Sequence, residues 1–301
     1  MRLYTVSHVK GRKIVATTTE TYISKSYLKT YMEAQNLPQW KTPIFNESSG
    51  QVVRILRPDE FKAVIRNMDA YDGAWNYFVS RNISTKTLVL WTQAKLYTGM
   101  RFSELIRLKN NPSYLEDDGN ISLPYAPGEK EMRTQKSRTI YLSDVGRKAV
   151  RLFLDEAGDL PSGTKNNVMG SLSHLDDVLK AAAEKSGLPS RDFVKTRKRI
   201  EVDKDAYKKM EPIERRKVER RESRYIHTTG VCNRSMRASW ESWLVAVFGS
   251  KPGMMERIFL SQGHKSMTAL MHYLNVRFDA DDILTMKKYV SGYMGIKIED
   301  I

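Results

Sequence analysis

The sequence predicts a mainly α-helical protein with a small antiparallel β-sheet, an α+β fold in two unequal parts. Several long segments repeat apolar residues three and four positions apart, which is the spacing of an amphipathic helix. A few short runs are rich in β-branched residues and bounded by turn formers, which indicates strands. Residues 36–50 carry turn formers without periodicity and are predicted to be a linker. We therefore expect a small module at residues 1–55 and a large domain at residues 56–301.

The chain is strongly basic. Its 50 lysines and arginines outnumber 35 aspartates and glutamates and give a formal net charge of +15 over 301 residues. So many like charges repel one another unless a polyanion neutralises them, so we expect nucleic acid as the partner. We expect no membrane partner and a cytosolic chain, because no apolar run suits a membrane helix and no signal-peptide pattern follows Met1. Cys232 is the single cysteine, which excludes an intrachain disulfide.

The small module is predicted to begin with a hairpin. Two segments rich in β-branched residues, 3–6 and 13–19, lie on either side of a basic turn. The turn has two interpretations, an ordinary solvated turn or an arm that contacts a phosphate backbone through Lys10, Arg12 and Lys13. Apolar and aromatic residues from position 22 to 31 then recur at helical spacing.

The large domain is predicted to start with a helix near Pro58, because proline in a first turn and acids after it favour a helix N-terminus. A second helix covers residues 84–97 and is broken at Gly99. The break places Arg101 at the start of a third helix. Backbone N–H groups and the positive end of the helix would favour a phosphate there.

Strands are predicted next at residues 121–123 and 139–142, and amphipathic helices at residues 146–158 and 171–186. Residues 190–224 then mix basic and acidic side chains. Such a run is typical of solvated helices laced with ion pairs four residues apart. The other interpretation is an insertion that lies along a DNA backbone. Its candidate contacts are Lys195, Arg197, Lys198, Arg199, Arg215 and Arg216.

Two further helices are predicted near the C-terminus, at residues 232–244 and within the tail at residues 279–301. Between them, the pair Gly263 and His264 precedes Tyr273 by a segment with apolar residues at helical spacing. An imidazole and a phenol hydroxyl are thereby held a fixed distance apart.

Three of these motifs together resemble those of the tyrosine recombinase (phage integrase) family. T-G-M-R-F-S-E-L at residues 98–105 matches the family box T-G-x-R-x-S-E-L at every fixed position. R-S-M-R at residues 234–237 aligns with the family's H-x-x-R, and residues 263–273 match its G-H pair and the tyrosine that follows. The resemblance covers roughly residues 57–290 and implies the tyrosine recombinase catalytic-domain fold.

The resemblance also implies a chemistry without a metal or another cofactor. Tyr273 would attack a DNA phosphate and form a 3′-phosphotyrosyl link. Arg101 and Arg237 would clamp the non-bridging oxygens of the transition state. His264 would hold or protonate a phosphoryl oxygen.

The sequence departs from the family at two catalytic positions. Arg234 replaces the histidine of H-x-x-R, and a guanidinium keeps donors but cannot exchange a proton, so proton abstraction falls to another base or to water. The family's hairpin lysine aligns with Arg133, which we expect to contact DNA. Lys136 is the candidate for the lysine that protonates the leaving 5′ oxygen, with Lys130 as the alternative.

The resemblance therefore implies a site-specific recombinase that integrates or excises a viral or mobile element at a double-stranded DNA attachment site. Exchange of two pairs of strands needs four active sites, so we expect a homotetramer on DNA and allow a monomer for the free chain. The C-terminal helix would dock on a neighbouring protomer or pack on its own domain. Two alternatives stay open: a type IB topoisomerase or telomere-resolving enzyme, and a non-catalytic DNA-binding relative.

Overall fold

The computed structural model describes residues 2–10, 13–22, 40–48, 51–70, 77–124, 137–200, 204–217, 220–264 and 276–300. The chain divides into two compact units, Met1–Thr42 and Pro43–Ile301. In the first unit, β1 (Arg2–Lys10) pairs antiparallel with β2 (Lys13–Tyr22), and Lys10 lies opposite Lys13. The predicted hairpin is confirmed, whereas Arg12 and the helix predicted after it lie outside the described residues.

The described part of the second unit contains three pairs of antiparallel strands. These pairs are β3 (Ile44–Ser48) with β4 (Gln51–Ile55), β5 (Ile121–Leu123) with β6 (Arg138–Ile140), and β7 (Arg191–Ile200) with β8 (Arg220–Thr229). The strand content is therefore small, as predicted, but the strands form separate two-stranded pairs and not one sheet.

Two of these hairpins correct the sequence interpretation. β3 and β4 lie at the end of the predicted linker and beyond it, because Ile44 pairs with Ile55 and Ser48 pairs with Gln51. The charged segment at 190–224 is a long hairpin, with two short helices, α8 (Lys204–Lys209) and α9 (Pro212–Lys217), between its strands. β-branched and aromatic residues at both ends of this segment favour strands, and the density of charge obscured that pattern.

The rest of the described unit is helical, so the mainly α-helical prediction is confirmed. The helices are α2 (Pro58–Arg66), α4 (Thr85–Thr98), α5 (Phe102–Asn110), α6 (Asp144–Glu156), α7 (Lys165–Lys185), α10 (Asn233–Phe248), α11 (Met254–Gln262) and α13 (Ala280–Val290). Several begin at a side chain that accepts a hydrogen bond from the first turn, namely Ser84, Ser143, Thr164 and Asp279. No helix in the described ranges is long and apolar enough to cross a membrane.

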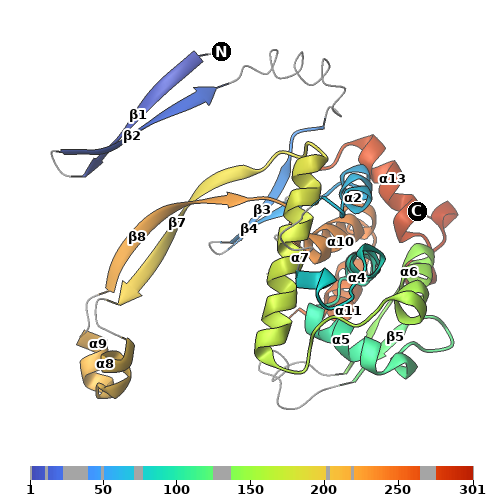
Figure 1. Cartoon of the computed structure of the whole chain (residues 1–301). Coiled ribbons are helices and arrows are strands. Elements are labelled where there is room, and N and C mark those ends of the chain that lie inside the picture. The colour runs from blue at the N-terminus through green and yellow to red at the C-terminus, as the bar shows by residue number, and fades with distance from the viewer. Residues whose placement is uncertain are drawn as a thin grey trace. The chain divides into compact units, whose positions relative to one another are not determined.

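Helix α10 is the centre of the second unit. It packs against α4, α7, α11, α13 and strand β4 (Figure 1). Trp240 and Trp243 on this helix are fully buried. The indole Nε1 of Trp243 donates to the carbonyl of Leu56 at 2.8 Å, and the backbone N–H of Leu56 donates to Ser239 Oγ at 2.8 Å. These bonds fix the end of β4 to the helix that carries Arg237.

Helix α13 packs on its own domain. It contacts α10, α6 and α2, and Arg57 Nε lies 2.8 Å from Asp282 Oδ2. Tyr293, which follows the helix, is fully buried with its ring 6.2 Å from that of Trp240. In the single chain, the C-terminal helix therefore has the intramolecular packing that was one of the two expectations.

Candidate active site

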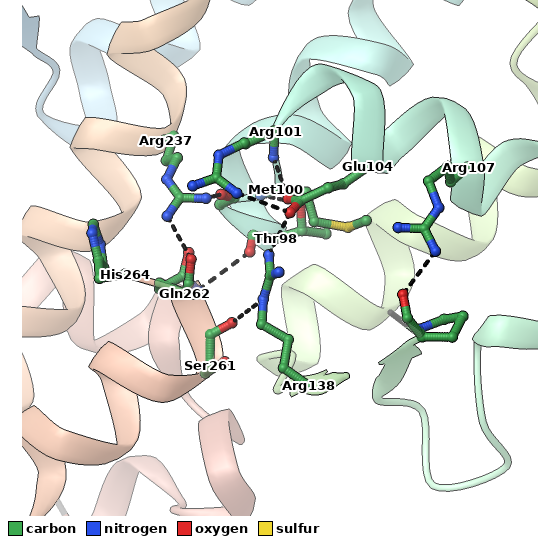
Figure 2. A network of polar contacts seen from close by, with 12 residues as sticks. Thr98, Met100, Arg101, Glu104, Arg107, Arg138, Arg237, Ser261, Gln262 and His264 are labelled. Atoms are coloured by element: carbon green, nitrogen blue, oxygen red, sulfur yellow. Dashed lines mark hydrogen bonds and ion pairs between the residues drawn. The ribbon is translucent and has the colours of Figure 1, made fainter. Parts of the chain in front are cut away.

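The ends of five elements meet in one polar cluster, which Figure 2 shows. The end of α4, the start of α5, strand β6, helix α10 and the end of α11 each contribute to it. Its ionisable side chains are Arg101, Glu104, Arg138, Arg237, Glu241 and His264. Residues far apart in the sequence are thereby held together by direct bonds.

A glycine in the left-handed region ends α4 and turns the chain toward α5. Gly99 has φ +63°, and a Cβ there would lie 2.1 Å from the side-chain oxygen of Gln262. A larger residue would therefore be strained and would displace Gln262. The turn makes Arg101 the N-cap of α5, and its backbone N–H donates to Glu104 Oε2 at 2.7 Å. The guanidinium is thus fixed at a helix N-terminus, as predicted.

Glu104 is a buried carboxylate among three guanidinium groups. Its side chain is fully buried, Arg138 Nη2 lies 2.8 Å from Oε1, and Arg101 Nη1 lies 3.4 Å from the same oxygen. Burial alone would raise the pKa of Glu104, but the charges of Arg138, Arg237 and Arg101 outweigh it, so the pKa is lowered. Glu104 therefore stays ionised and allows three like charges to remain close.

Arg237 is fixed at three nitrogen atoms. Nη1 donates to the carbonyl of Gly99 at 2.9 Å, Nη2 to the carbonyl of Gln262 at 2.5 Å, and Nε lies 2.8 Å from Glu241 Oε1. Gly99 is the C-cap residue of α4 and Gln262 is the last residue of α11, so this guanidinium on α10 connects the ends of two other helices. A lysine has no planar fork and cannot reproduce that set of bonds.

His264 follows the end of α11 and is bound to the same carboxylate. Gly263 ends the helix with φ +64°, and His264 Nε2 lies 2.9 Å from Glu241 Oε1. The carboxylate itself is fully buried, and the imidazole is 12% exposed. The arginine and the histidine that the family motifs single out therefore share one buried partner.

Lys95 adds a buried positive charge one turn before Gly99. Burial lowers the pKa of Lys95 to about 8, and the charge of Arg237 acts in the same direction, against Asp176 and Glu104. The total charge of the site therefore changes just above neutral pH.

The cluster suits a phosphate. Three guanidiniums face two carboxylates, so these five groups carry one positive charge in excess, with Lys95 not counted. Arg101 is the most exposed of the three guanidiniums, at 31%, against 15% for Arg237 and 10% for Arg138. Guanidinium groups bind phosphate oxygens through paired hydrogen bonds, so Arg101 is the group that an anion from solvent meets first. No group of three metal-binding side chains occurs in the described segments.

The structure brings together three of the predicted catalytic residues, namely Arg101, Arg237 and His264. Arg234 lies one turn earlier on α10 with an exposed side chain. Burial raises the pKa of Asp176, and the charge of Arg234 is among the groups that oppose that rise. Tyr273, Lys136, Lys130 and Arg133 lie outside the described residues.

Two members of the cluster were missed from the sequence. Arg138 directly precedes the strand predicted at residues 139–142, in a charged segment where a basic residue is usually solvated. Glu241 lies four residues after Arg237, which is the spacing of an ordinary helix ion pair. That spacing was the one available signal, and it does not reveal the contact with His264.

Comparison with known proteins finds only low similarity. No family model and no curated protein matches the chain. Among solved structures, the crystal structure of XerA recombinase is similar with 15% sequence identity over 87% of this chain and 72% of that chain, at a TM-score of 0.40.

Proposed function

We propose that this protein is a site-specific DNA recombinase that cuts and rejoins DNA through a covalent link to Tyr273. The observation that carries the proposal is the contact network of Arg101, Arg237 and His264, which come from three separate elements. Each occupies the position that its family motif assigns to it. Surface arginines that merely neutralise acids have no reason to converge in this way.

The proposed reaction is a phosphoryl transfer in which the number of phosphodiester bonds is conserved. The phenol oxygen of Tyr273 attacks a backbone phosphate, the bond from phosphorus to the 5′ oxygen breaks, and a 3′-phosphotyrosyl link forms. The phenol proton leaves to a base, and Lys136 donates a proton to the departing 5′ oxygen. Arg101 and Arg237 stabilise the additional negative charge of the transition state. The reverse steps rejoin the strand.

Trapping on nicked DNA tests this proposal. A duplex library with randomised sequence around a nick releases the short 5′-hydroxyl fragment after cleavage, so the covalent complex accumulates. The wild type should yield recoverable adducts, and Tyr273→Phe should yield none. Absence of any adduct would favour the non-catalytic relative. Relaxation of supercoiled plasmids regardless of their sequence would favour the topoisomerase alternative. We also propose that the protein acts as a tetramer on DNA, because recombination between two sites exchanges two pairs of strands and needs four active sites.

We propose that the long hairpin of β7 and β8 contacts the DNA backbone on one face. Directly opposed residues of an antiparallel pair share a face, and the faces alternate along each strand. The register pairs Arg199 with Arg221 and Lys195 with Tyr225. The face that holds these positions has five basic residues and no acid: Arg191, Lys195, Arg197, Arg199 and Arg221. A two-stranded ribbon with such a face suits a DNA groove or its phosphates.

The opposite face supplies a matched control. It holds three basic and two acidic positions, namely Lys198, Arg220, Arg224, Asp192 and Glu222. Glutamine at Lys195, Arg197 and Arg199 should weaken DNA binding and reduce the slope of log affinity against log salt by about 0.9 for each phosphate that the variant no longer neutralises. Glutamine at Lys198, Arg220 and Arg224 removes the same charge and should change the slope less. Equal slopes for the two triple variants would contradict a one-sided interface.

A further inference from the structure

Glu241 is a buried acid inside the proposed site with no counterpart among the motifs that predicted it. Its carboxylate is fully buried, and a single oxygen, Oε1, lies 2.8 Å from Arg237 Nε and 2.9 Å from His264 Nε2. Burying a carboxylate is costly, and a well-packed apolar residue in the same place would often be at least as stable. Packing of α10 therefore does not explain an acid at this position.

The two bonds fix two groups of the site at once. One carboxylate oxygen can accept hydrogen bonds from the Arg237 Nε–H and from an imidazole Nε2–H at the same time. The ring is held from another side as well, because it stacks on Phe259 with centroids 6.4 Å apart, and its backbone N–H donates to the Phe259 carbonyl at 3.3 Å. Arg237, for its part, has its orientation set by Glu241 at Nε and by two carbonyls at its terminal nitrogens.

We infer that Glu241 is a positioning residue that holds Arg237 and His264 in one arrangement, so that the two groups act on the same phosphate as a unit. The inference rests on the proposed function for its role in cleavage. Preorganised donors contribute most when they need no rearrangement as charge develops. Glu241 provides that fixed arrangement without touching the substrate.

Glu241→Gln keeps the length of the side chain and removes its charge. The amide does not provide the charge-assisted bonds that both partners make. The rate of covalent trapping should therefore fall by about 10- to 100-fold, the range for groups that orient a functional side chain. The affinity of Glu241→Gln for uncleaved DNA should stay within about twofold of the wild-type affinity. The substitution removes one negative charge, which would repel DNA, and adds none.

A double-mutant cycle with His264→Asn separates positioning from a general structural effect. If Glu241 acts in part through His264, the double variant should lose less trapping rate than the product of the two single losses, and the remaining loss reflects the contact with Arg237. Glu60 is the matched control, because it is another buried glutamate, 2.7 Å from Arg54 and outside the site. The effects of Glu60→Gln and His264→Asn should multiply. Multiplication for Glu241→Gln as well would overturn the inference.

A spectroscopic measurement tests the contact of Glu241 with His264 and Arg237 without an activity assay. In nitrogen-15 spectra, the signals that disappear in His264→Asn and in Arg237→Lys identify the His264 ring and the Arg237 Nε–H group. Glu241→Gln should move both sets of signals, and Glu60→Gln should move neither. If the wild type traps no DNA, the proposed function fails, yet this result still supports the shared contact. Unmoved signals in Glu241→Gln would overturn the contact itself.

Discussion

Glutamine in place of Glu104 is expected to lower the free energy of unfolding by about 3–5 kcal/mol, the usual cost of removing one partner from a buried ion pair. The carboxylate lies 2.8 Å from Arg138 Nη2 and is fully buried. Without it, the guanidiniums of Arg101, Arg138 and Arg237 repel one another in a region with little water. Denaturant unfolding of the two proteins measures the difference.

The pH dependence of that difference has a defined sign. The folded chain holds the pKa of Glu104 below its ordinary value of 4.5, so the unfolded chain binds the proton more readily. The stabilisation is therefore fully present at neutral pH and is lost as the pH falls below about 4.5 toward the pKa of the folded chain. The wild type and Glu104→Gln should become more alike in acid.

A surface acid provides the control for this prediction. Glu184 is 67% exposed and lies 4.0 Å from Lys180. Its replacement by glutamine should change the free energy of unfolding by less than about 0.5 kcal/mol. A Glu104→Gln variant that is as stable as Glu184→Gln would show that the three guanidiniums do not depend on the buried charge.

Arg237→Lys is expected to slow covalent trapping by about 10²- to 10³-fold, the range for losing one preorganised donor to a transition state. Lysine keeps the charge but loses the fork that reaches the carbonyls of Gly99 and Gln262 together with Glu241. Binding of uncleaved DNA should change much less, because the net charge of the site is the same. Single-turnover trapping rates and binding isotherms measure the two effects separately.

Arg147→Lys is the matched control for Arg237→Lys. Arg147 also donates from both terminal nitrogens to main-chain carbonyls, at 3.0 Å to Leu142 and 3.2 Å to Gly292, but it lies outside the cluster. Its replacement should affect stability and leave the trapping rate nearly unchanged. Equal losses of rate in the two variants would mean that Arg237 acts through folding alone.

Local signals in the sequence predicted the helices and the position of Arg101 at the start of one of them. Pro58, the glycine that ends α4 and the capping side chains act within one or two turns, so their effect can be read without knowledge of the fold. The position of Arg101 at the start of α5 follows from the same local geometry.

The remaining features depend on contacts between distant segments. Phe193 and His227 pair across the long hairpin, and no property of either strand alone specifies that register. Glu241 was missed for a similar reason, because its partner His264 follows a different helix. Convergence of Arg101, Arg237 and His264 was expected from the resemblance to a family, whereas the buried carboxylates that hold them were visible only in the structure.

Mass spectrometry of the trapped complex tests the central claim most directly. After digestion with nuclease and trypsin, the peptide at residues 266–277 should carry the mass of a nucleotide, and Tyr273 is the single tyrosine in it. Fragmentation should place the modification on Tyr273, and Tyr273→Phe should abolish the adduct. A nucleotide attached to any other residue, or an adduct that persists in Tyr273→Phe, would contradict Tyr273 as the nucleophile.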